Sequence, residues 1–244
     1  MKTFFTLPIA VASLLTLATT ASAATLATWT APESTTPASP GYTINDGVLP
    51  ANSPFTYSTN TSTWFARGDS SDLVNVYNQG WTVAQQQDAA IAAESYIEFS
   101  LTADENYQFD VTDISANIAA QSLAYTATEA MDVYAFIRTS VDDYATTVGD
   151  ATLNLPASPQ DSTATRSGTV TATSLDPEYS SITGTVTYRI YYYIDTAAVS
   201  TNQVLRLYST TIEGTTSVIP EPATMGLFGG AFALAMMLWV RRRR

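Results

Sequence analysis

The sequence contains no cysteine and no histidine among its 244 residues. Without cysteine the chain forms no disulfide and offers no thiolate to a metal ion. Without histidine, a Ser-His-Asp triad, a His-ligated zinc site and an imidazole general base are all excluded. The residue types of several common catalytic and metal centres are therefore missing.

Positive charge is also scarce, with 10 basic against 22 acidic side chains and a net charge of −12. Half of the basic residues stand at the two ends of the chain. Residues 24–217 therefore carry 21 carboxylates against five arginines, a net charge of −16. Proteins that bind nucleic acid neutralise its phosphates with Lys and Arg. We therefore expect no nucleic-acid partner.

Residues 1–23 have the pattern of a secretory signal peptide. Lys2 supplies a basic start, and residues 4–18 form an apolar run. The small residues that follow end at Ala23 and fit the cleavage pattern of signal peptidase. We therefore expect cleavage between Ala23 and Ala24 and export of the rest of the chain.

A second apolar run, residues 223–240, carries no charge. At about 1.5 Å per residue its length suffices to cross a bilayer core of about 30 Å as a helix. The four residues that follow form a basic tail of the kind that stays on the cytoplasmic side of a membrane, namely Arg241, Arg242, Arg243 and Arg244. These features predict one C-terminal transmembrane helix that anchors the protein in a membrane.

Pro220, Glu221 and Pro222 directly precede this apolar run. Two prolines two positions apart disfavour a helix and favour an extended backbone, the form that a protease cleft holds. The order of this tripeptide, a membrane helix and a basic tail, behind a signal peptide, resembles the PEP-CTERM sorting signal over residues 218–244. The resemblance implies a Gram-negative host in which the helix anchors the protein in the inner membrane before processing. It also implies processing near the tripeptide by an exosortase, and a place at the cell surface or in an exopolysaccharide or biofilm matrix.

Residues 24–217 are predicted to form one all-β domain, because Thr, Ser, Tyr and Val dominate and apolar residues alternate with polar ones. This pattern predicts a two-layer antiparallel β-sandwich, and we prefer a jelly-roll-like topology. In the last strand, Leu205 and Leu207 are expected on one face and Ile212 on the other. The expected strands cover residues 95–103, 107–112, 133–139, 185–194 and 203–212.

Three segments carry further expectations. The short polar turn 104–106 predicts that the strands on either side of it form a hairpin. Residues 24–54 are rich in Pro, Ser and Thr and are expected to form an extended arm or irregular edge. Residues 83–94 have the composition of a helix or a loop.

The resemblance to PEP-CTERM proteins extends weakly into this domain. Many members have a strand that enters an Arg-Ser-x-Asp-Gly-Phe-like turn. Residues 137–144 (IRTSVDDY) are the counterpart here, with Asp143 in place of the usual glycine.

Tyr191 and Tyr193 are the candidate residues for a carbohydrate-binding platform. They are expected on the opposite face from Tyr188 and Tyr192, which are expected in the core. If exposed, their rings offer apolar faces on which sugars stack; cross-strand pairing within the sheet is the alternative.

The acidic residues offer two weaker alternatives. Glu94 and Glu98 suggest a glycosidase, but four residues along a strand span about 13 Å, whereas such carboxyl pairs lie about 5–9 Å apart. Asp142, Asp143 and Asp150 flank an expected loop whose oxygens would suit Ca²⁺, although their spacing matches no calcium-loop motif.

These features predict an exported, non-enzymatic protein with a structural or interaction role in the extracellular polymer layer. Its partners would be signal peptidase and exosortase during maturation, the membrane before processing, and exopolysaccharide afterwards. A glycan-binding module is the alternative and a secreted glycoside hydrolase the third reading. No cofactor is expected, and calcium is the one metal left open.

Overall fold

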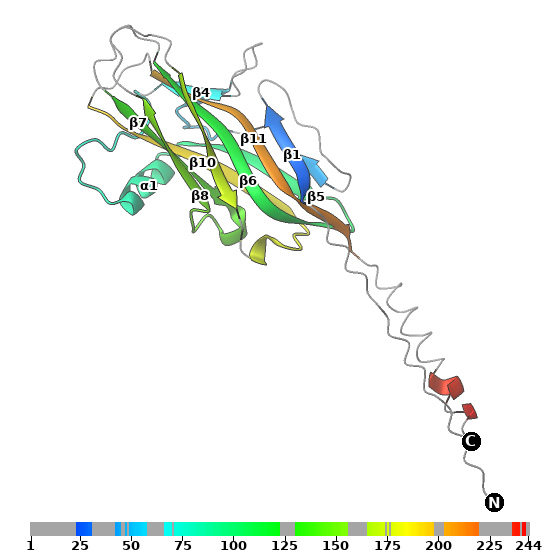
Figure 1. The fold of residues 1–244 in the computed structure, drawn as a ribbon. Helices are drawn as coiled ribbons and strands as arrows, with labels where there is room; N and C mark the ends of the chain where they lie inside the picture. Colours follow the sequence, from blue (N-terminus) through cyan, green and yellow to red (C-terminus); the bar gives the residue numbers. More distant parts are fainter. Residues whose placement is uncertain are drawn as a thin grey trace, which may run out of the picture.

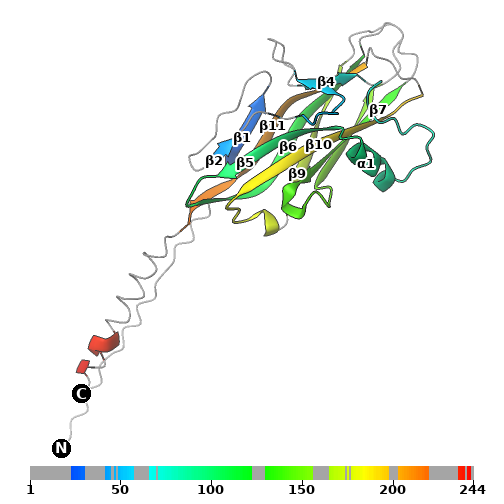
Figure 2. The same ribbon diagram turned by 180° about the vertical axis from the view of Figure 1, so that it is seen from behind.

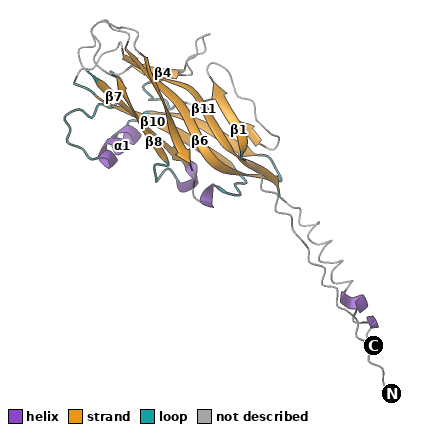
Figure 3. Cartoon of the chain, viewed as in Figure 1, coloured by secondary structure: helices purple, strands orange, loops and turns teal. Residues whose placement is uncertain are grey.

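In a computed structural model of the chain, eleven strands of the described residues form two antiparallel sheets packed face to face (Figure 1, Figure 3). The described residues are 23–30, 42–44, 47, 49–57, 66–69, 71–122, 130–155, 165–173, 175, 177–197, 203–219, 236–239 and 241–242. The two-layer antiparallel sandwich expected from the sequence is therefore confirmed.

Sheet A is the six-stranded layer, in which β1 pairs with the second half of β11 beside the main path β3-β4-β11-β6-β9. Sheet B is the five-stranded layer, in the order β2-β5-β10-β7-β8. The strands of sheet A are β1 (Ala24–Thr30), β3 (Phe55–Tyr57), β4 (Ala66–Asp69), β6 (Tyr107–Ser122), β9 (Thr165–Thr173) and β11 (Gln203–Val218). Those of sheet B are β2 (Tyr42–Ile44), β5 (Tyr96–Ala103), β7 (Met131–Thr139), β8 (Gly149–Leu155) and β10 (Thr185–Asp195).

The core lies between the sheets and is built from alternate residues of their strands, as the period-two pattern predicts. In β5, Ile97, Phe99 and Leu101 are each 1% exposed. The ring of Trp29 in β1 of sheet A lies 4.7 Å, centroid to centroid, from that of Phe99 in sheet B. Tyr192 of β10 also points into the core, where its ring meets that of Phe55.

The expected hairpin over residues 95–112 is wrong. β5 pairs with β2 and β10 in sheet B, whereas β6 pairs with β11 and β9 in sheet A, so the turn at residues 104–106 carries the chain from one layer to the other. In a sandwich both strands face the same core, and their alternation is therefore identical whether they pair or cross.

The face expected for Ile212 is also wrong. Its side chain is fully buried in the same core as Leu205 and Leu207. The β6–β11 register shifts between Leu207 and Ser209, and such a bulge reverses the faces of the residues that follow it, Ile212 among them. A single extra residue in the ladder thus moves Ile212 from the outer face to the core.

The extended arm expected for residues 24–54 is wrong at its start, whereas the alternative of an irregular edge agrees with a strand that pairs with β11 off the main path and carries a register shift. Ala24–Thr30 forms β1, whose Leu26, Ala27 and Trp29 are at most 1% exposed. The first residue of this strand, Ala24, is also the residue expected at the mature N-terminus. It pairs with Gly214 of β11.

Within the described residues one helix is long enough to cover part of a sheet, and it confirms the helical alternative for residues 83–94. α1 (Val83–Ala92) begins with a capping box in which Thr82 and Gln85 satisfy each other's backbone N–H groups. It packs over the outer face of sheet B beside β10 (Figure 2). The 3₁₀ turns are η1 (Ser140–Asp142) and η2 (Pro177–Tyr179).

The segments expected to act in targeting lie almost wholly outside the described residues. Residues 1–22, the Pro-Glu-Pro tripeptide and most of 223–240 are among those not described. Within the described part of the chain, no helix has the length and apolar character needed to span a membrane. The transmembrane helix thus stays a prediction.

Candidate functional site

The outer face of sheet B carries a band of aromatic side chains formed by direct cross-strand pairs. Tyr193 of β10 lies opposite Tyr134 of β7, and their rings stack 4.7 Å apart at an interplanar angle of 8°. Tyr191 lies opposite Phe136, with the rings 4.9 Å apart at 10°. Such pairs stabilise neighbouring strands. The stacked aromatic pairs thus stabilise the pairing of β7 with β10.

Tyr191 and Tyr193 are on the expected face, but the structure does not expose them as a platform. Tyr191 is 1% and Tyr193 3% exposed. Their rings stack on β7, and α1 covers the cluster with Ala90 and Ile91. The strand pattern predicts the face of each ring, whereas the covering helix comes from a segment about 100 residues earlier in the chain.

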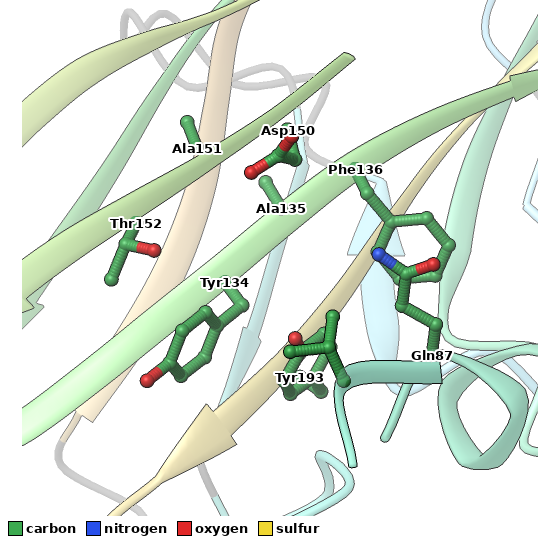
Figure 4. Close-up of a pocket in the computed structure, with 9 residues that line it drawn as sticks. Gln87, Tyr134, Ala135, Phe136, Asp150, Ala151, Thr152 and Tyr193 are labelled. Atoms are coloured by element: carbon green, nitrogen blue, oxygen red, sulfur yellow. The ribbon is translucent and has the colours of Figure 1, made fainter. Parts of the chain in front are cut away.

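A cavity of about 160 Å³ opens at the edge of this aromatic band, between α1, β7 and β8 (Figure 4). We call it the β8 cavity. It is lined by Val83, Gln87, Tyr134, Ala135, Phe136, Asp150, Ala151, Thr152 and Tyr193.

The β8 cavity exists because short side chains on β8 stand opposite large rings on β7. Thr152 pairs with Tyr134 and Asp150 pairs with Phe136, so the hollow lies over the shorter partners. Between these two pairs, Ala135 and Ala151 face each other and form the floor. β8 is the edge strand of sheet B, which leaves the hollow open on that side.

Gly149 fixes the position of the wall formed by β8. A Cβ atom at this residue would collide with the carbonyl oxygen of Thr171 in β9, across the sandwich. The absence of a side chain therefore lets β8 approach β9 closely and places Asp150 at the mouth of the cavity.

Gln87 of α1 forms the opposite wall, and its amide is oriented by its neighbours. Its Oε1 accepts a hydrogen bond from the Thr147 hydroxyl at 2.9 Å and one from Arg138 Nη2 at 3.4 Å. With the oxygen occupied, the Nε2 end of the amide is available to donate toward the cavity (Figure 4).

The electrostatic character of the β8 cavity is negative. Burial raises the pKa of Tyr193 to about 12, with further contributions from Tyr134 and the Asp150 carboxylate. Burial also raises the pKa of Tyr134, as do Asp132 and Asp195. Both phenols therefore stay protonated at neutral pH and offer hydroxyl groups that donate and accept hydrogen bonds.

The tyrosines make alkaline pH a direct test of this packing. A phenol whose pKa is raised by folding contributes stability that is complete below its unfolded pKa of about 10 and is lost as the pH rises through the folded value. We expect the protein to lose stability between about pH 10 and 12, where Tyr193 titrates. Phenolate absorbance and circular dichroism followed together should show ionisation coupled to unfolding.

Tyr193→Phe should move the alkaline transition to higher pH, because it removes one of the titrating groups. Tyr77→Phe is the matched control, since Tyr77 is 42% exposed. Ionisation of all the phenols near pH 10 with the fold intact would contradict the assignment.

Beyond the aromatic band, Arg189 of β10 joins sheet B to the loop after β7. Its Nε donates to Glu98 Oε2 at 2.8 Å, and its guanidinium lies 4.4 Å from the ring centroid of Tyr96 and 3.9 Å from that of Tyr144. The carboxylate of Glu98 is thus part of an ion pair. Glu94 lies just after α1 with a φ of 52°, where it ends the helix. Of the two residues suggested for a glycosidase, Glu98 therefore forms an ion pair within sheet B and Glu94 stands at the end of a helix.

The loop expected to hold calcium satisfies its own polar groups. The Asp142 carboxylate accepts hydrogen bonds from the backbone N–H groups of Ala145 and Thr146. Asp143 adopts the left-handed conformation, φ 57°, that the glycine of the related turn would supply. Asp150 lies at the start of β8 and thus flanks this loop, as expected. No group of three acidic side chains suited to a metal ion occurs among the described residues.

Sequence reasoning missed the β8 cavity because it did not predict β8 as a strand. The signal was present, since Asp150 and Thr152 alternate with Ala151 and Leu153. Gln87 could not have been assigned to the site from its own sequence neighbourhood, because only the docking of α1 brings it there.

The comparisons with known proteins bear on the end of the chain. Residues 218–244 match the model of the PEP-CTERM protein-sorting motif. The chain carries a PEP-CTERM sorting signal. This confirms the resemblance seen in the sequence and implies an exported, cell-surface-targeted protein that an exosortase processes. No curated protein matches the chain.

Several solved structures are similar to the domain at a low level. A xylan-binding module, CBM15, is 13% identical with a TM-score of 0.30, over 72% of this chain and 91% of the module. Xylanase10C from Cellvibrio japonicus is 11% identical with a TM-score of 0.31, over 73% of this chain but 27% of the xylanase. A native virion of Kashmir bee virus gives 12% and 0.32, over 74% and 73%. Likenesses at this level carry no argument about function.

Proposed function

We propose that this protein is an exported, non-enzymatic β-sandwich with a structural or interaction role in the extracellular polymer layer of a Gram-negative bacterium. Signal peptidase would remove residues 1–23, the helix at 223–240 would hold the protein in the inner membrane, and an exosortase would then release or transfer it. We keep a jelly-roll-like topology of the strands as part of this proposal. The single observation that carries the proposal is the sorting motif at residues 218–244.

The arrangement of the sandwich around its two ends supports this route. β11 ends at Val218, where the sorting motif begins, and the Ile219 N–H still donates to the Asn106 carbonyl at 2.7 Å. Ala24, the expected mature N-terminus, pairs with Gly214, four residues before Val218 on the same strand. Both processing steps would therefore act at one end of the sandwich, leaving its remaining surface available for partners.

A direct test is whether the mature protein associates with the polymer layer of its host. Exopolysaccharide collected from the medium and washed in high salt should retain the processed protein, and a strain without exosortase should leave its exopolysaccharide free of it. Mature protein found only in the free, soluble fraction of the medium would contradict a matrix role.

The β8 cavity favours glycan binding as a second function. Its ring of aromatic and hydrogen-bonding side chains suits a sugar, because apolar sugar faces pack on rings while hydroxyls bond to Tyr, Thr and Gln. Binding to an array of polysaccharides that disappears in Tyr134→Ala would support this function. Equal binding across all glycans would contradict it.

A further inference from the structure

Negatively charged side chains predominate around the β8 cavity. Among the nine described residues that line it, Asp150 is acidic and none is basic. Asp132 and Asp195 lie opposite each other on β7 and β10, close enough to raise the pKa of Tyr134. Carboxylates therefore lie near both tyrosine rings, and Asp150 is the one that lines the cavity.

Among the residues that the structure describes, Arg138 is a cation near the cavity, on the far side of Gln87. The guanidinium of Arg138 is held there by hydrogen bonds to the Tyr144 carbonyl at 2.9 Å, to the Thr147 hydroxyl at 3.3 Å and to Gln87. It is therefore directed at the loop after β7. The guanidinium carbon also lies 5.7 Å from the centroid of the Phe136 ring, which lines the cavity.

The lining chemistry suits a positively charged group on a ring. The half-buried Tyr134 presents an aromatic ring that attracts a cation, with the ring of Tyr193 stacked on it, and Asp150 supplies a charge-assisted hydrogen-bond acceptor beside it. A carboxylate in the same place would face Asp150 without a basic partner in the wall. Like charges so placed disfavour binding.

The volume of the β8 cavity and its position on the sandwich both suit a ligand that approaches from the solvent. About 160 Å³ is less than the roughly 300–1,000 Å³ of sites for larger ligands, so the cavity suits a single sugar ring of a chain. Tyr193 lies eight residues along β10 from Thr185, about 26 Å at about 3.3 Å per residue. Thr185 is at the end of the sandwich near residue 219, so the cavity lies far from the sorting segment.

We propose that the β8 cavity binds an amino sugar, with the ammonium group between Asp150 and the ring of Tyr134, in preference to neutral sugars and against uronic acids. This inference rests on the proposed glycan-binding function and specifies its ligand class. The polymer that it fits is one with unsubstituted amino groups, opposite in charge to the protein's own acidic surface.

The test compares hexamers of β-1,4-linked glucosamine, glucose and glucuronic acid by titration calorimetry, with the glucosamine amines protonated and the salt at a physiological level. We expect the glucosamine hexamer to bind at least about tenfold more tightly than the glucuronic acid hexamer, with glucose between them. Asp150→Asn should weaken glucosamine binding by about tenfold more than glucose binding. Glu105→Gln removes the same charge from the exposed turn before β6 and should leave the order unchanged.

The outcomes separate the ligand class from the glycan-binding function. Equal or tighter binding of the glucuronic acid hexamer would overturn the amino-sugar assignment and leave glycan binding in place. A glucosamine preference that survives in Asp150→Asn, or falls equally in Glu105→Gln, would reflect overall charge and overturn the role of the cavity. If none of the three hexamers binds the wild-type protein, both the ligand class and the glycan-binding function are overturned, while the sorting of the protein is unaffected.

Discussion

Replacing Pro220, Glu221 and Pro222 together with alanine is expected to abolish processing of the C-terminal tail. The substitution removes the extended backbone that the two prolines impose and the carboxylate between them. Loss of two contacts of about 1.4 kcal/mol each would lower the specificity constant of the processing enzyme about 100-fold. Immunoblots of envelope and medium should show an unprocessed species in the membrane and almost no mature protein outside the cell.

The control removes two prolines elsewhere. Pro156→Ala with Pro159→Ala alters a segment before β9 and should leave processing at the wild-type level. The expectation fails if the triple alanine variant is processed as efficiently as the wild type, or if both variants lose processing to the same extent.

Trp29→Ala is expected to cost about 3–5 kcal/mol of the free energy of unfolding, the range for a fully buried large aromatic residue. Trp29 is 1% exposed, and its ring contacts Phe99 across the sandwich. A domain of this size has a total stability of about 5–15 kcal/mol, so the loss would be a large part of it. Denaturant unfolding followed by tryptophan fluorescence and circular dichroism would measure it.

Trp81→Ala is the matched control, because Trp81 is 38% exposed and precedes α1. A surface substitution of this kind should change the free energy of unfolding by less than about 0.5 kcal/mol. A Trp29→Ala cost no greater than that of Trp81→Ala would mean that β1 does not belong to the stable sandwich.

The sequence was sufficient to predict the fold class and the interior faces of the long strands, because both follow from local alternation. Ile97, Phe99 and Leu101 point into the core for this reason. Ile212 could not be placed, since a bulge five residues earlier reversed its face without any mark in the hydrophobic pattern. The pairing of β5 was also hidden, because alternation does not show which layer a strand joins.

The candidate site was less predictable, since it depends on contacts between distant segments. Tyr191 and Tyr193 were placed on the correct face of sheet B, yet their burial results from α1, which docks from a separate part of the chain. The β8 cavity depends on the register that sets Thr152 against Tyr134. Cross-strand register is a property of the folded sheets, and a single sequence does not specify it.

The central claim, that the domain is exported and then sorted through its C-terminal signal, is tested most directly by intact mass. The protein would be recovered from both the envelope and the medium of its native host. The account predicts a mature species that begins at Ala24 and ends near Pro220–Pro222, with or without the mass of an attached group. A species that retains Arg241, Arg242, Arg243 and Arg244 in both fractions would show that the tail is a permanent anchor and would contradict the sorting account.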